Sequence, residues 1–76
     1  MINIITKQLK SAFKDADIEI KGYSNNVNNN KFDLRISSSK FRGRNKVQQH
    51  QLVYKELHNF LKTGEIHAIS LTTLEK

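Results

Sequence analysis

Three histidines, His50, His58 and His67, are the side chains best suited to metal chemistry in this sequence. His50 and His58 stand eight positions apart in one stretch of helical periodicity, which separates them by about 12 Å along the helix axis. One metal ion cannot bind both, so they do not form a zinc pair. His67 is the second residue of a short strand-like run over 66–71, where a neutral imidazole at the rim of a sheet could bind a metal. From the residues alone, a structural histidine that bonds a main-chain carbonyl or packs under a helix is the favoured interpretation.

The residue types that support catalysis are missing or badly spaced. The chain has no cysteine, which excludes a disulfide, a thiolate nucleophile and a sulfur-ligated metal site made by this chain alone. No Ser-His-Asp spacing and no glycine-rich phosphate loop occurs, and Asp15, Asp17 and Glu19 are expected to be solvated. The sequence therefore predicts a protein that is not an enzyme and has no cofactor of its own.

Four cations, Lys40, Arg42, Arg44 and Lys46, alternate through a turn that precedes the second predicted helix. We call these four residues the basic turn. Thirteen Lys and Arg against seven Asp and Glu give a net charge of +6, a field that attracts nucleic acid, acidic protein surfaces or anionic membranes. The basic turn could contact phosphates, although such runs are usually solvated. It lacks the second glycine of a GXXG phosphate clamp, which disfavours RNA binding in the manner of KH domains.

Periodicity predicts the elements that position these side chains. Apolar residues at helical spacing predict helices over 2–15 and 46–62, the second ended by Gly64. Alternation with period two predicts strands over 18–21 and 32–36, joined by a hairpin rich in asparagine. Serines 37–39 break the second strand, Phe41 anchors the turn in the core, and Gly43 allows the change of direction.

A third strand is predicted over 66–71, after the long helix, so it is expected to cross over to a parallel neighbour. The resulting fold class is α+β, in the order α-β-β-α-β, with both helices on one face of a three-stranded mixed sheet. With 76 residues the chain is expected to be a single domain over 1–76. It has neither an apolar run of membrane-spanning length nor a secretory signal, so we expect a soluble, intracellular monomer with no membrane partner.

Three ordered segments carry a resemblance to a known family. They are Ser38-Ser39-Lys40-Phe41-Arg42-Gly43-Arg44 before the second helix, Val47-Gln48-Gln49-His50-Gln51-Leu52-Val53-Tyr54 in that helix, and Ile66-His67-Ala68-Ile69-Ser70 at the third strand. Together they resemble the BolA family, whose topology is like that of the type II KH fold. The sequence departs from the family pattern in the asparagine-rich loop over 24–30, which has no His or Cys, and at 72–76, which lacks the usual Pro and Trp.

The resemblance implies a non-enzymatic accessory protein that partners a monothiol glutaredoxin in [2Fe-2S] cluster assembly, cluster transfer or iron regulation. His67 would be the ligand that this chain contributes to the shared cluster, while glutaredoxin and glutathione supply thiolates. A nitrogen ligand in place of a thiolate raises the cluster potential, as in Rieske centres. Because the hairpin loop offers no second ligand, either His67 acts alone on this side or the two proteins meet without a cluster.

Two alternatives remain at this stage. One is a DNA-binding transcriptional regulator that uses the basic turn, since the corresponding region is credited with DNA binding in some members of the family. The other is a small basic interaction domain with neither activity. The cytoplasm is the expected compartment, with the nucleus and the mitochondrion left open.

Overall fold

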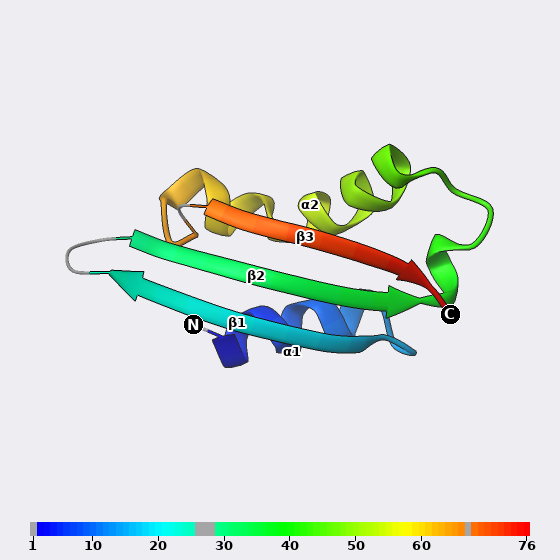
Figure 1. The fold of residues 1–76 in the computed structure, drawn as a ribbon, viewed down its shortest axis with the longest axis horizontal. Helices are drawn as coiled ribbons and strands as arrows, with labels where there is room; N and C mark the ends of the chain where they lie inside the picture. The colour runs from blue at the N-terminus through cyan, green and yellow to red at the C-terminus, as the bar shows by residue number, and fades with distance from the viewer. Residues whose placement is uncertain (1, 26–28, 67) are drawn as a thin grey trace.

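Two helices lie on one face of a three-stranded sheet in the computed structural model, which describes residues 2–25, 29–66 and 68–76 (Figure 1). In chain order the elements are α1 (Ile2–Ala12), β1 (Asp17–Asn25), β2 (Asn29–Ser38), the 3-10 helix η1 (Ser39–Phe41), α2 (Lys46–Thr63) and β3 (Ala68–Glu75). The predicted α+β class and the order α-β-β-α-β are confirmed.

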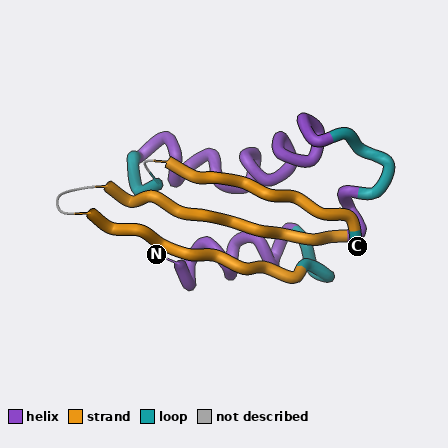
Figure 2. Tube along the Cα trace, in the orientation of Figure 1, coloured by secondary structure: helices purple, strands orange, loops and turns teal. Residues whose placement is uncertain are grey.

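The sheet has the order β1-β2-β3, with β2 in the centre (Figure 2). β1 pairs antiparallel with β2, with Ile20 opposite Leu34, and β3 pairs parallel with β2, with Leu71 opposite Leu34. These three residues therefore lie in one row across the sheet. The parallel pairing confirms that α2 makes a crossover between β2 and β3.

The core fills the layer between the helices and the sheet. Its buried side chains are Ile5, Leu9, Phe13, Ala16, Phe32, Leu34, Ile36, Phe41, Val53, Leu57 and Ile66. Complete burial of one large aliphatic or aromatic side chain contributes about 1.5–3 kcal/mol, so this layer is the main source of stability. Both helices use the same face of the sheet, and the opposite face therefore presents exposed charged residues, among them Glu19 and Arg35.

Both ends of α2 are fixed by local chemistry. Asn45 Oδ1 accepts the Gln48 N–H at 2.9 Å and Gln48 Oε1 accepts the Asn45 N–H at 3.1 Å, which forms a capping box. The helix ends at Gly64, whose φ of 81° is left-handed and suits glycine best. Gly43 has a φ of 74° in the turn before α2. The predicted roles of Gly43 and Gly64 are confirmed.

Several element boundaries differ from the predictions. α1 ends at Ala12 and not at residue 15, although the Phe13 N–H still donates to the Leu9 carbonyl at 2.7 Å. Phe13 is buried in the core, so the apolar period continues beyond the helix. β2 continues to Ser38, two residues beyond its predicted end at Ile36, so Ser37 and Ser38 do not break the strand. β3 spans Ala68–Glu75 and not 66–71, because Ile66 lies in the bend that follows α2.

The asparagine-rich segment belongs largely to the hairpin ladder. Asn25 of β1 is paired with Asn29 of β2, and Ser24 with Asn30, so the strands extend further than alternation of apolar residues indicated. The sequence favours a hairpin connection formed by Gly22 and the asparagine run, but Gly22 is a β1 residue paired with Phe32, so the connection is shorter. Residues 26–28, between the two strands, lie outside the described residues.

Candidate functional site

The basic turn extends from Lys40 in the short helix η1 to Lys46, the first residue of α2. Phe41, at the end of η1, is fully buried and packs against Phe13 with a centroid separation of 5.4 Å. The prediction that Phe41 anchors the turn is therefore confirmed. Lys40, Arg42, Arg44 and Lys46 are all exposed. Their predicted role in binding nucleic acid stays a prediction.

Each cation of the basic turn also donates to a main-chain carbonyl. Lys40 Nζ bonds the carbonyl of Ala12 at 2.5 Å, and Arg44 Nε bonds that of Lys40 at 3.2 Å. Arg42 Nε donates to the carbonyl of Lys76, and Lys46 Nζ to that of Thr73. Ammonium and guanidinium groups have further N–H donors. The basic turn thus holds chain segments together while keeping donors for an external anion.

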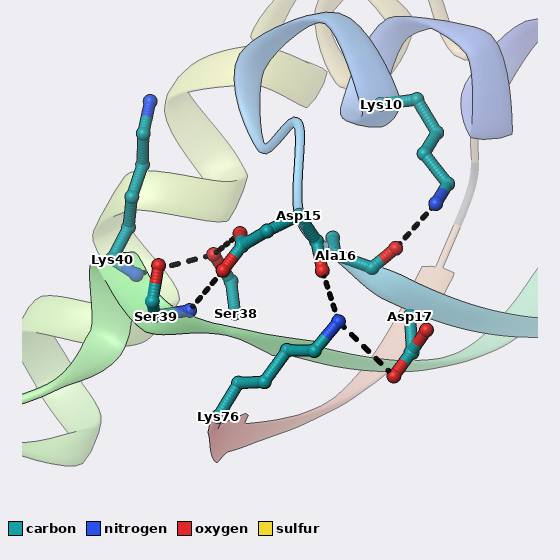
Figure 3. Close-up of polar contacts among 8 residues, drawn as sticks. All are labelled: Lys10, Asp15, Ala16, Asp17, Ser38, Ser39, Lys40 and Lys76. Atoms are coloured by element: carbon teal, nitrogen blue, oxygen red, sulfur yellow. Dashed lines mark hydrogen bonds and ion pairs between the residues drawn. The ribbon is translucent and has the colours of Figure 1, made fainter.

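The start of η1 is held by the carboxylate of Asp15, which lies in the turn between α1 and β1 (Figure 3). Asp15 accepts the Ser38 hydroxyl at 2.8 Å and the Ser39 N–H at 3.0 Å. These hydrogen bonds from Ser39 and Ser38 hold the pKa of Asp15 well below its ordinary value of 3.8. Sequence reasoning treated Asp15 as a solvated helix-end residue. That interpretation missed its capping role, because its partners lie 23 and 24 positions away.

Gln49 is a second residue whose role the sequence did not reveal. It is 2% exposed, and its side-chain amide donates to the carbonyls of Phe41 at 3.2 Å and Arg44 at 2.8 Å. Its Oε1 accepts the buried hydroxyl of Thr73 at 2.6 Å. Gln49 therefore fixes the basic turn to α2 and α2 to β3. In the sequence it is one glutamine among three in the stretch Gln48–Gln51, and helical phase alone could have marked it as inward-facing.

The two histidines of α2 are surface residues. His50 is half-buried, with its ring at 80° to that of Tyr54 and a centroid separation of 6.4 Å, and His58 is exposed. Within the described residues no group of three or more His, Cys, Asp or Glu could hold a metal ion. The expectation that His50 and His58 do not form a zinc pair stays a prediction.

His67 lies outside the described residues, so its predicted role as a cluster ligand stays a prediction. Its two neighbours are placed. Ile66 is 1% exposed and its N–H donates to the Phe60 carbonyl at 3.0 Å, while Ala68 begins β3 and is paired with Lys31 of β2. The chain on both sides of His67 is thereby fixed to α2 and to the central strand.

The open face of the sheet carries mixed charge. A shallow depression of about 330 Å³ is lined by Glu19, Lys21, Asp33, Arg35 and Thr72. None of the predicted site residues lines this depression. In the described part of the chain no helix is both long and apolar enough to cross a bilayer.

Comparison with known proteins identifies the family. The sequence model of a family described as BolA-like protein matches residues 9–76. A protein of Acinetobacter guillouiae, described as an uncharacterized protein in the rpoN-murA intergenic region, is 36% identical over 72 residues that cover 95% of this chain and 81% of that one. A BolA-like protein of Dictyostelium discoideum is 34% identical over 73 residues, which cover 92% of this chain and 62% of that one.

A solved structure agrees with the sequence matches. BolA1 from Arabidopsis thaliana superposes with a TM-score of 0.81 at 26% identity, covering 96% of this chain and 88% of that one. The shared core is the arrangement described above, two helices on a three-stranded mixed sheet. Because the family match begins within α1 and extends through β3, this chain belongs to the BolA-like protein family.

Proposed function

We propose that this chain is a non-enzymatic accessory protein that partners a monothiol glutaredoxin and contributes His67 to a shared [2Fe-2S] cluster. The observation that carries the proposal is family membership over residues 9–76, which includes the Ile66-His67-Ala68 segment. The resemblance assigns the cluster ligand to the histidine of this segment.

The arrangement of the sheet supports a site at one end of the molecule. β2 begins at Asn29, and its Lys31 is paired with Ala68 at the start of β3. The beginnings of β2 and β3 therefore lie at the same end of the sheet (Figure 1). In the BolA family, the segments that precede these two strands supply ligands.

The donor set of this chain is compatible with a cluster whose thiolates come from a partner. Without cysteine it offers no thiolate, and its hairpin offers asparagines, which are poor ligands for iron. The thiolates would come from glutaredoxin and glutathione. A nitrogen ligand from His67 would raise the reduction potential of the cluster, which suits a role in tuning or transferring it.

Co-purification with a monothiol glutaredoxin in the presence of glutathione tests this function, read out by visible circular dichroism. We expect a mixed complex whose spectrum differs from that of the glutaredoxin homodimer. His67→Ala should leave the contact in place but shift the spectrum toward the homodimer, because the nitrogen ligand is lost.

His50→Ala is the matched control, since it removes an imidazole from α2, and it should leave the spectrum unchanged. Pulsed electron paramagnetic resonance on the wild-type complex should detect nitrogen coupled to iron. A wild-type complex without that coupling, together with an unfolded His67→Ala variant, would assign His67 to packing instead.

DNA binding by the basic turn is the second candidate, favoured by its four exposed cations. Phosphate contacts by Lys and Arg release counterions, and each contributes a slope of about 0.9 in log K against log salt for duplex DNA. Neutralising Arg42, Arg44 and Lys46 together should weaken binding and flatten this slope. An unchanged slope would place the footprint elsewhere, and no binding at low salt would reject this function.

A further inference from the structure

The two edge strands of the sheet differ in their protection against pairing with another chain. β1 carries Asp17, Glu19 and Lys21, all exposed, and Asp17 also forms an ion pair with Lys76 at 3.4 Å. Charged side chains along an edge discourage the addition of a further strand. β1 is therefore a protected edge.

β3 itself carries no such charges from Ala68 to Leu74, and the cation that contacts its main chain is Lys46, at the carbonyl of Thr73. Its sequence Ala-Ile-Ser-Leu-Thr-Thr-Leu-Glu has no charge before Glu75 and no proline, and it pairs only with β2 among the described strands. Ile69, Leu71 and Leu74 are half-buried. An added strand would cover these side chains and pair the main-chain groups that point away from β2.

Two cations flank the C-terminal part of this edge. Lys46 donates to the carbonyl of Thr73 and Arg42 to that of Lys76, so both ammonium and guanidinium groups lie beside the end of β3. The whole chain has a net charge of +6. Pairing of β3 with a second copy would bring together two molecules that each carry a net charge of +6, which repel each other. A strand with acidic residues would instead be attracted by Lys46 and Arg42.

We propose that the free edge of β3 accepts an extended segment of an acidic partner protein, which adds a fourth strand to the sheet. The segment runs antiparallel to β3, alternates apolar with small polar side chains, and has acidic residues at its N-terminal end, beside Lys46 and Arg42. This surface is independent of the role proposed for His67.

A synthetic peptide with two glutamates followed by alternating valine and threonine, eight residues long to match β3, is the probe. We expect amide hydrogen exchange, followed residue by residue by NMR, to slow at alternate positions of β3 when the peptide is added. Binding should be lost with a peptide that is N-methylated along the edge facing β3, because the hydrogen-bond donors are removed.

Two variants test the charge. Lys46→Gln should weaken binding of the acidic peptide about two- to fivefold, the range of an exposed ion pair, and should not weaken binding of the peptide with glutamine in place of glutamate. Lys55→Gln, which replaces an exposed lysine on the same helix, should change the affinity for neither peptide.

Slowed exchange in β1 or α2 in place of β3, or no binding of the unmethylated peptide, would overturn the proposal. So would slowing in β3 that depends only on protein concentration, because that would identify a second copy as the occupant.

Discussion

At the level of single residues, Asp15 links the end of α1 to the turn after β2. Its carboxylate accepts hydrogen bonds from Ser38 and Ser39, which favour the ionised form and lower its pKa. A group with a lowered folded-state pKa contributes stability that is complete above its unfolded pKa and is lost as the pH falls. The capping contribution of Asp15 should therefore decline below about pH 3.8.

Asp15→Asn should lower the urea midpoint at neutral pH, because the amide accepts the two serine donors less well than the carboxylate. The difference between wild type and variant should shrink as the pH falls below 3.8, and this is measured by urea unfolding at a series of pH values. Asp33→Asn is the control, because Asp33 is exposed on the open face of the sheet. An equal effect of the two substitutions would contradict the capping role.

Gln49, unlike the exposed Asp15, is a buried polar side chain whose amide oxygen and nitrogen both form hydrogen bonds. Gln49→Ala would leave the Thr73 hydroxyl and the carbonyls of Phe41 and Arg44 without this partner, at a cost of about 1–3 kcal/mol in unfolding free energy. Gln51→Ala, at an exposed position of the same helix, should stay within about 0.5 kcal/mol of wild type. Chemical denaturation of both variants measures these differences in unfolding free energy. Equal stability of the Gln49→Ala and Gln51→Ala variants would show that the hydrogen bonds of Gln49 are dispensable.

At the level of elements, the ends of α2 are determined by a few residues near each terminus. Asn45→Ala removes the side-chain acceptor of the capping box and should cost about 1 kcal/mol of stability. The same substitution at Asn59, exposed within α2, should be neutral or slightly stabilising, because alanine is the better helix former. Thermal unfolding of the pair gives the comparison, and a loss at Asn59 as large as that at Asn45 would argue against the cap.

The features of the fold that could be predicted from the sequence are those that depend on residues close to each other along the chain. The periods of α1 and α2, the alternation of Ile18 and Ile20, and the glycine that ends α2 are local signals, and each gave the right element. The missed boundaries depend on distant partners. Ser38 is buried in β2 because Asp15 bonds it, and Thr73 is buried in β3 because Gln49 does, 24 positions earlier.

The candidate site also has features that could be predicted from neighbouring residues and features that depend on distant ones. The cations of the basic turn could be grouped because they are close in sequence, and the structure shows that each of them is exposed. Their bonds to the carbonyls of Ala12, Thr73 and Lys76 could not be predicted, since these acceptors come from other elements. His67 lies outside the described residues, so its role rests on the family and on the experiments proposed above.

At the level of the whole molecule, charge determines how copies of the chain meet each other and their partners. A net charge of +6 on 8.8 kDa opposes self-association, so we expect a monomer when the protein is alone. Sedimentation velocity at low ionic strength checks this expectation. A dimer that is strongest at low salt would contradict it and would also weaken the case for an acidic partner at β3.

The absence of cysteine leads to a prediction for the isolated protein. Anaerobic reconstitution of the chain alone with iron and sulfide should give no thiolate-to-iron charge-transfer bands, because it can offer imidazole but no thiolate to a [2Fe-2S] cluster. The same reconstitution with a monothiol glutaredoxin and glutathione should develop them. Absorption spectra of the two samples, with iron and sulfide determined after gel filtration, make the measurement. A stable cluster in the isolated chain would mean that other groups of this protein replace the missing thiolates, and the shared arrangement would then be unnecessary.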